Sequence, residues 1–280
     1  MRKLFSKLAL VAVLGLALTF ASCFDNDDDD DLGGSSSSSV GNSSSSVTGG
    51  GGSFSTSDCL SGLYNGYPDK GNDIANYKTI QIGDQIWMAE NLNYNVKGRS
   101  YCYLECMNLE SYDHAYADII ANNCAKYGRL YDWSTAMAFS TDFCNSSLCD
   151  SKVETKHQGI CPSGWHIPSV EDWEILIDLV SNSGSLNQRG IKLKATSGWN
   201  NYGDESGNGT DDYDFSALPG GVRAYSSTPY NGVGERGYWW SSSESGKDHA
   251  QRMSIDNSPY AALDYVGTKK IYNSVRCIKD

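Results

Sequence analysis

Cysteine content constrains this chain more than any other feature, because nine cysteines occur in 280 residues. Cys23 directly follows an N-terminal apolar segment, which leaves eight for the folded part, and we expect residues 58–280 to contain four disulfides. Zinc knuckles also use closely spaced cysteines, as in Cys102/Cys106 and Cys144/Cys149. No histidine lies beside either pair, so disulfides are favoured over zinc. Eight cysteines allow roughly a hundred pairings, and spacing alone selects none of them. The eight are Cys59, Cys102, Cys106, Cys124, Cys144, Cys149, Cys161 and Cys277.

Residues 1–22 have the pattern of a secretory signal. Three basic residues precede the apolar segment Leu8–Ala21, which is shorter than the roughly 20 residues that a membrane-spanning helix needs. The segment Ala21-Ser22-Cys23 resembles a bacterial lipobox, in which the cysteine is lipidated and becomes the mature N-terminus. We therefore expect Cys23 to carry a lipid anchor in the bacterial outer membrane.

Residues 23–57 are predicted to form a disordered tether. Asp27–Asp31 is an unbroken acidic run, which is typical of a solvated spacer and also resembles the export signal of surface-exposed lipoproteins. Gly33–Ser57 consists mostly of serine and glycine and has almost nothing to bury. We expect it to hold a folded domain a short distance from the membrane, facing the exterior.

The charge balance excludes two classes of partner. The chain has a formal net charge of −12 at pH 7. A nucleic-acid-binding protein needs a basic face toward phosphate, and a protein held to anionic lipid by charge needs the same. We therefore expect no nucleic-acid partner, and membrane contact only through the lipid anchor.

Local patterns in residues 58–280 indicate an α+β domain. Tyr77–Ile82 and Gln85–Ala89 have strand composition and flank a Gly-Asp turn, which predicts a hairpin. Ser169 and Asp172 form a variant of the capping box before apolar residues at helical spacing, which predicts a helix that ends near Asn182. Asp132 is expected to cap a short helix. Beyond residue 184 the chain is rich in Gly, Asn, Ser, Asp and aromatic residues and has few helix patterns, which predicts short strands joined by long loops. Tyr272–Ile278 is predicted as the last strand.

One segment is rich in oxygen ligands. Asp204–Asp214 combines acidic and amide side chains with glycine, which suits a hard cation such as calcium, although it lacks the EF-hand pattern. The alternative is a polar turn whose side chains cap their own backbone. A structural calcium is the only cofactor that we expect. Its candidate ligands are Asp204, Asn208, Asp211, Asp212 and Asp214.

Aromatic residues are frequent in the second half of the chain. Exposed rings stack on sugar faces or anchor a protein partner. Most rings in a small domain are core, as we expect for Trp239 and Trp240. The ligand-binding candidates are Trp199, Tyr202, Tyr225 and Tyr230.

Catalytic motifs are absent from the sequence. The four histidines form no H-E-x-x-H pair, and no G-x-S-x-G element occurs. His166 lies in an apolar stretch and is predicted to be a structural residue. Paired carboxylates for glycoside hydrolysis are invisible in a sequence, so an extracellular enzyme stays the third hypothesis.

Seven segments together resemble the Fibrobacter succinogenes major paralogous domain family, whose members are exported by bacteria. They cover nearly all of residues 75–280 in order. The segments are 82–92 (IGDQIWMAENL), 127–133 (YGRLYDW), 161–168 (CPSGWHIP), 193–199 (LKATSGW), 207–212 (GNGTDD), 215–221 (FSALPGG) and 274–277 (SVRC).

That family is similar to C-type lectin-like folds, and the resemblance implies an α+β domain with two helices, short antiparallel strands and long loops. It also implies a bridge between Cys161 before the predicted helix and Cys277 on the last strand. Cys102–Cys124 is the next choice, and Cys144–Cys149 and Cys59–Cys106 follow by elimination. The calcium-and-sugar motifs of true C-type lectins are absent. Formylglycine-generating oxidases use the same fold with a reactive cysteine pair near the C-terminus, where this chain has Cys277 alone.

These observations together predict a surface-exposed lipoprotein with a non-catalytic binding domain. Polysaccharide or glycoprotein is the first expected ligand. A protein–protein adhesion or assembly module is the alternative, and the irregular segments between about residues 200 and 265 are the expected contact region.

Overall fold

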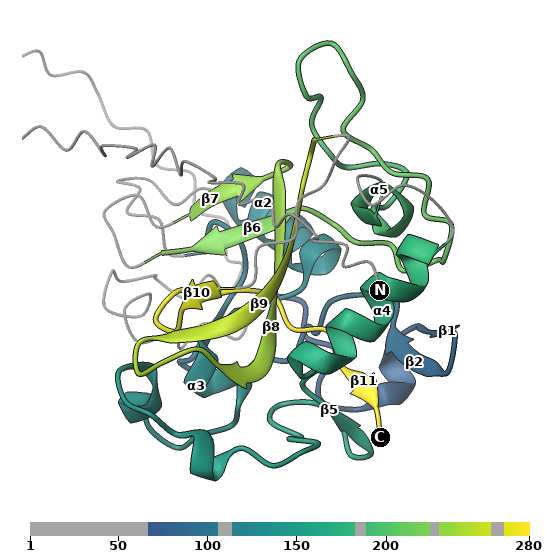
Figure 1. The fold of residues 1–280 in the computed structure, drawn as a ribbon. Coiled ribbons are helices and arrows are strands. Elements are labelled where there is room, and N and C mark those ends of the chain that lie inside the picture. Colours follow the sequence, from purple (N-terminus) through teal and green to yellow (C-terminus); the bar gives the residue numbers. More distant parts are fainter. Residues whose placement is uncertain (1–66, 106–113, 183–188, 225–229, 259–265) are drawn as a thin grey trace, which may run out of the picture. The chain divides into compact units, whose positions relative to one another are not determined.

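The computed structural model describes residues 67–105, 114–182, 189–224, 230–258 and 266–280, all of which belong to the second of two units, Gly52–Asp280. The fold is α+β with several small antiparallel sheets, as the sequence predicts (Figure 1). Among the described helices, none has the length and apolar character to cross a bilayer.

The strands group into four sheets. One has the order β1-β2-β11-β5, a second has the order β10-β9-β8, and the pairs β3-β4 and β6-β7 form the other two. The strands are β1 Thr79–Ile82, β2 Gln85–Met88, β3 Ser100–Tyr101, β4 Leu130–Tyr131, β5 Trp165–His166, β6 Gly220–Arg223, β7 Tyr230–Val233, β8 Arg236–Glu244, β9 His249–Asp256, β10 Val266–Thr268 and β11 Ile278–Lys279.

The helices differ in length and type. The longest, α2 and α4, lie in different halves of the chain (Figure 1). The α-helices are α2 His114–Tyr127, α3 Trp133–Ala136, α4 Val170–Asn182 and α5 Arg189–Leu193, and the 3-10 helices are η1 Ile74–Asn76, η2 Asp142–Asn145 and η3 Asp150–Lys152.

Helix α4 confirms the predicted capping box. The Asp172 backbone N–H donates to Ser169 Oγ at 3.1 Å, and the Ser169 backbone N–H donates back to the Asp172 carboxylate at 2.9 Å. This reciprocal pair satisfies two backbone donors at the start of the helix. The apolar face then packs into a buried cluster with β2, β8 and β9, where the Trp87 and Trp173 rings lie 4.6 Å apart.

The predicted hairpin is also confirmed. Strands β1 and β2 pair in antiparallel register, with Ile82 opposite Gln85 across the turn. Gly83 has a φ of +60°, and a Cβ at this position would lie 2.4 Å from Leu179 Cδ1 on α4. Glycine therefore provides the left-handed turn and also allows α4 to pack closely against it.

The predicted helix cap at Asp132 is confirmed, whereas the predicted last strand is not. Asp132 caps α3, since its carboxylate accepts a hydrogen bond from the Thr135 backbone N–H at 2.7 Å. The predicted last strand is wrong in extent, because regular strand structure covers only Ile278–Lys279. Residues 272–274 form isolated bridges to three different segments instead of one ladder, so no continuous strand develops there.

Three of the segments quoted for the family resemblance meet at one buried arginine. Arg276 is fully buried and donates to Asn91 Oδ1 at 2.9 Å and to the Phe215 backbone carbonyl. Trp239 Nε1 also donates to Asn91 Oδ1, at 2.8 Å. Burial lowers the pKa of Arg276 to about 9. This polar network joins segments that lie far apart in the sequence inside the core.

Candidate functional site

A cluster of tyrosines surrounds one arginine where four segments meet. Tyr101 ends β3, Arg223 ends β6, and Tyr230 begins β7 directly opposite Arg223 in the β6-β7 register. Tyr272 forms an isolated bridge with Arg223 from the other side. We use the name tyrosine cluster for Tyr101, Tyr103, Tyr230 and Tyr272 around Arg223.

The rings of the tyrosine cluster enclose the guanidinium. Arg223 Cζ lies 4.0 Å from the Tyr101 ring centroid, 5.0 Å from that of Tyr272 and 5.9 Å from that of Tyr230. Tyr101 and Tyr272 meet edge to face at 5.2 Å, and Tyr103 and Tyr230 meet in the same way at 5.1 Å. Cation–π and edge-to-face contacts at these distances hold the side chains in fixed positions.

The cluster has a buried base and an open edge. Tyr101 and Tyr103 are buried, whereas Tyr230, Tyr272 and Arg223 are partly exposed. Burial raises the pKa of the Tyr103 and Tyr272 hydroxyls, so both stay protonated at neutral pH. Desolvation opposes the charge of Arg223, but the surrounding tyrosine hydroxyls outweigh it and raise the pKa of the guanidinium. The open edge therefore combines a fixed positive charge with two aromatic rings.

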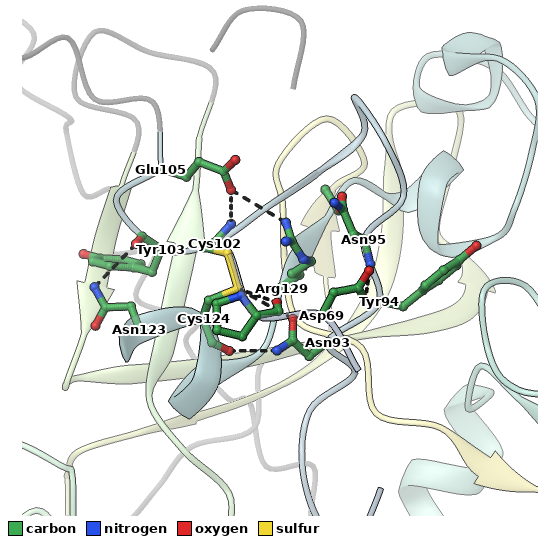
Figure 2. Close-up of a disulfide and its surroundings, with 12 residues drawn as sticks. Asp69, Asn93, Tyr94, Asn95, Cys102, Tyr103, Glu105, Asn123, Cys124 and Arg129 are labelled. Atoms are coloured by element: carbon green, nitrogen blue, oxygen red, sulfur yellow. Dashed lines mark hydrogen bonds and ion pairs between the residues drawn. A yellow bond between two sulfur atoms is a disulfide. The ribbon is translucent and has the colours of Figure 1, made fainter. Parts of the chain in front are cut away.

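Next to the cluster is the Cys102–Cys124 disulfide, which joins the segment after β3 to helix α2. Figure 2 shows the Glu105 carboxylate beside this disulfide, where it accepts a hydrogen bond from the Cys102 backbone N–H at 2.7 Å. The Tyr230 hydroxyl donates to the Glu105 backbone carbonyl. Glu105 thus connects the disulfide to the tyrosine cluster. Burial raises the pKa of the Glu105 carboxyl to about 6.

Arg129 lies on the other side of Glu105. Its Nη1 is 3.7 Å from Glu105 Oε2, so the two groups form an ion pair without a hydrogen bond (Figure 2). The side chain is fully buried, and none of its three nitrogens has a hydrogen-bond partner in the part of the chain that the structure describes. A buried guanidinium with no hydrogen bonds is energetically costly, so the Arg129–Glu105 pair is incompletely satisfied.

The structure separates the four aromatic ligand candidates. Trp199 is only 4% exposed and its Nε1 donates to the Ala217 carbonyl at 3.0 Å, so its prediction as a ligand-stacking ring is wrong. Tyr202 is 54% exposed but is not part of the tyrosine cluster. Tyr225 lies outside the described residues. Tyr230 is the one candidate that the structure places in a group of aromatic side chains.

The acidic segment 204–214 uses two of its predicted calcium ligands as caps. Asn208 Oδ1 accepts from the Trp199 backbone N–H at 3.0 Å, and Asp211 accepts from Ser216 N at 2.7 Å and Ser216 Oγ at 2.6 Å. Among the residues that the structure describes, no three acidic, histidine or cysteine side chains gather as metal ligands do. These contacts correspond to the polar-turn alternative. Asp204, Asp212 and Asp214 are exposed.

Three predicted disulfides are present in the structure. The fourth predicted pair, Cys59–Cys106, and the lipidation site Cys23 lie outside the described residues. The three disulfides are Cys102–Cys124, Cys144–Cys149 and Cys161–Cys277.

Most members of the tyrosine cluster were not candidates from the sequence. Tyr101 and Tyr103 flank Cys102, and a two-residue spacing of tyrosines at the end of a strand is typical of two rings on one face. That spacing is a usable signal. Arg223 and Tyr272 carry no such local signal, because strand pairing alone brings them to the same place. His166, predicted as structural, is buried, with Nδ1 2.8 Å from Asp280 Oδ1.

Comparison with family models gives one match. The model of the Fibrobacter succinogenes major domain matches residues 80–279, which include every member of the tyrosine cluster. No curated protein and no solved structure matches the chain. The matched region is well over half of the sequence and contains the segments that meet at Arg276. The chain therefore belongs to the Fibrobacter succinogenes major domain family.

Proposed function

We propose that this chain is a surface-exposed lipoprotein of the bacterial outer membrane whose domain binds polysaccharide or glycoprotein without catalysis. The tyrosine cluster is the proposed binding site. The observation that carries the proposal is the Arg223 guanidinium held among tyrosine rings, with Tyr230 and Tyr272 partly exposed.

The chemistry of the cluster suits a sugar ligand. A pyranose ring has an apolar face that stacks on tyrosine and hydroxyl groups that hydrogen-bond to tyrosine and arginine. The side chains are held by one another and by the Tyr230–Glu105 hydrogen bond, so binding immobilises few rotamers. Such preorganisation increases the affinity that a small contact area provides.

The remaining parts of the proposal come from the sequence and the disulfides. The signal pattern and Cys23 support the lipid anchor, and the acidic tether supports display at the exterior. A C-type lectin-like architecture is proposed because Cys161–Cys277 joins the segment before α4 to the chain end, where β11 pairs with β5.

Quantitative binding to a panel of polysaccharides tests the proposal. The full chain in detergent is assayed against soluble and insoluble polymers, together with Tyr230→Ala and Tyr272→Ala. Tyr202→Ala is the matched control, because Tyr202 is an exposed tyrosine outside the cluster. We expect each cluster variant to weaken binding at least about tenfold and the control to bind normally. Binding that survives both cluster substitutions, or no binding to any polymer, contradicts the proposal.

Calcium stays a separate proposal for residues 204–214. If a structural calcium binds there, the melting temperature rises with calcium and falls again with EDTA. Asp212→Asn and Asp214→Asn then remove the calcium response. An unchanged melting temperature overturns the calcium proposal alone, because the tyrosine cluster contains none of these residues. Asn208 and Asp211 would then act only as the caps that the structure shows.

One observation favours an adhesion or assembly module as the second candidate. Phe143, which precedes the short Cys144–Cys149 loop, is 61% exposed, and Leu148 within the loop is 67% exposed. Large apolar side chains displayed on a rigid loop are typical of protein contacts. Cell aggregation that is lost in Phe143→Ser/Leu148→Ser and retained in Tyr230→Ala favours this candidate over glycan binding.

A further inference from the structure

We infer that the tyrosine cluster selects acidic sugars, with Arg223 pairing to the carboxylate of a uronic acid unit in the ligand. This inference rests on the proposed function and assigns its ligand class.

Arg223 has a positive charge that no described carboxylate neutralises by an ion pair. Its side-chain contacts in the described part of the chain are with tyrosines: the guanidinium lies over three rings and hydrogen-bonds to the Tyr230 side chain. By contrast, Arg99 pairs with Asp142 at 2.8 Å, and Lys269 pairs with Glu244 at 2.5 Å. A partly exposed guanidinium that is fixed in position and has no ion-pair partner among the described residues is suited to an anionic group from outside the chain.

The geometry leaves hydrogen-bond donors for such a group. Ring contacts through the π face use none of the N–H donors of a guanidinium, and the hydrogen bond to Tyr230 uses only part of its five. Arg223 Nε is buried and has no hydrogen-bond partner in the structure. A guanidinium presents its donors as a planar fork, which matches the two oxygens of a carboxylate. Tyr272 and Tyr230 lie beside this fork, where they would contact the sugar ring that carries the carboxylate.

The neighbouring carboxylate already has other contacts. Glu105 lies near Arg223, but its carboxylate accepts from Cys102 N at 2.7 Å and lies 3.7 Å from Arg129 Nη1. Asp132, whose charge raises the pKa of the Tyr272 hydroxyl, caps α3 by accepting a hydrogen bond from Thr135 N. The Glu105 carboxylate therefore has the charges of both Arg129 and Arg223 in its surroundings, so two cations share one carboxylate and this corner attracts an anion, although the whole chain has a net charge of −12.

Two polymers that differ only in this charge provide the test. The full chain in detergent is titrated with polygalacturonate and with fully methyl-esterified polygalacturonate, which has the same backbone without the charge. We expect the acid form to bind at least tenfold tighter, and Arg223→Gln to lower its affinity to that of the ester. Arg223→Lys keeps the charge without the fork and is expected to retain only part of the preference.

Controls separate recognition from general attraction. Arg252 also lies over a tyrosine ring, 4.2 Å from the Tyr238 centroid, so Arg252→Gln is the matched control and should keep the wild-type preference. Dextran sulfate is the second anionic arm, and we expect it to bind more weakly than polygalacturonate at equal charge concentration. Thermal melting confirms that each variant is folded.

Each outcome has one meaning. Equal binding of acid and ester by the wild type overturns the inference, as does a preference that persists in folded Arg223→Gln. Equal or tighter binding of dextran sulfate reduces the effect to unspecific charge attraction and also overturns it. Binding of neutral polymers that depends on Tyr230 but shows no acid preference leaves the proposed function intact. Absence of binding to every polymer overturns both.

Discussion

Two regions of this domain, which we call the Cys144–Cys149 corner and the Cys102–Cys124 corner, contain the same kinds of groups but differ in hydrogen bonding. At each, a disulfide lies beside a buried ion pair, and the carboxylate of that pair accepts a hydrogen bond from a cysteine backbone N–H. At the Cys144–Cys149 corner, Glu244 accepts from Cys149 N at 2.9 Å and pairs with Lys269. At the Cys102–Cys124 corner, Glu105 accepts from Cys102 N at 2.7 Å.

The cations of the two corners differ in how well they are satisfied. Lys269 Nζ donates to Glu244 Oε1 at 2.5 Å, the Ser147 carbonyl at 3.2 Å and the Lys247 carbonyl at 3.3 Å. The Arg129 side chain is equally buried but makes no hydrogen bond with any described residue. A fully satisfied buried pair stabilises one geometry, whereas a pair without hydrogen bonds contributes little to stability. We therefore regard the first corner as a structural clamp and the second as the support of a binding site.

Replacing the two cations is expected to give the largest difference. Lys269→Met leaves Glu244 as an unpaired buried charge and removes three hydrogen bonds, so the free energy of unfolding should fall by about 3–5 kcal/mol. Arg129→Met removes no hydrogen bond and should cost at least about 2 kcal/mol less than Lys269→Met. Denaturant unfolding measures both. Equal losses in the two variants would contradict the contrast between the corners.

Removing each disulfide gives the next largest effect. The chain-entropy relation predicts a loss of about 3 kcal/mol for the Cys102–Cys124 bridge, with a sequence separation of 22. It predicts about 2 kcal/mol for Cys144–Cys149, with a separation of 5. Paired Cys→Ala variants in chemical denaturation check the order. A larger loss for the shorter loop would show that the clamp depends on its disulfide more than on chain entropy.

The pH dependence of stability isolates Glu105. Burial raises the pKa of its carboxyl from 4.5 to about 6, so the folded chain binds this proton more tightly than the unfolded chain does. Ionised Glu105 therefore costs about 2 kcal/mol above pH 6, and this cost disappears as the pH falls toward 4.5. The difference in unfolding free energy between wild type and Glu105→Gln should change in this window. A difference independent of pH from 7.5 to 4.5 would refute this.

The smallest predicted effect concerns single side chains at the two corners. Tyr230→Phe removes the hydrogen bond to the Glu105 carbonyl and should lower stability by about 1 kcal/mol. Phe143→Ser changes an exposed side chain at the clamp corner and should alter stability by no more than about 0.5 kcal/mol. Thermal melting of both variants checks this, and a larger effect at Phe143 would show that its ring packs against the domain.

Local signals explain how much of the fold the sequence predicts. Helix α4 and the β1-β2 hairpin depend on caps, turn residues and spacing within a short segment, and both are confirmed. Helix α2 was missed although Ile120, Cys124 and Tyr127 lie on its buried side. Its packing depends on the disulfide to Cys102, which lies in another segment.

The site is less predictable because it has no local signature. Tyr230 was a candidate from composition, but Arg223 and Tyr272 reach it only through bridges between distant segments. Composition also suggested Trp199, whose ring is buried against Ala217 and Phe215 within one core cluster. An aromatic residue in a loop-rich region has the same sequence context whether its ring faces solvent or the core, and only tertiary packing distinguishes the two.

Hydrogen exchange of the full chain with and without polygalacturonate compares ligand protection at the two corners in one experiment. The account predicts slower exchange on ligand addition in residues 100–105, 220–224, 230–233 and 271–274, and no change in residues 142–152. Protection confined to residues 142–152, or no protection in the tyrosine cluster at saturating ligand, would contradict it.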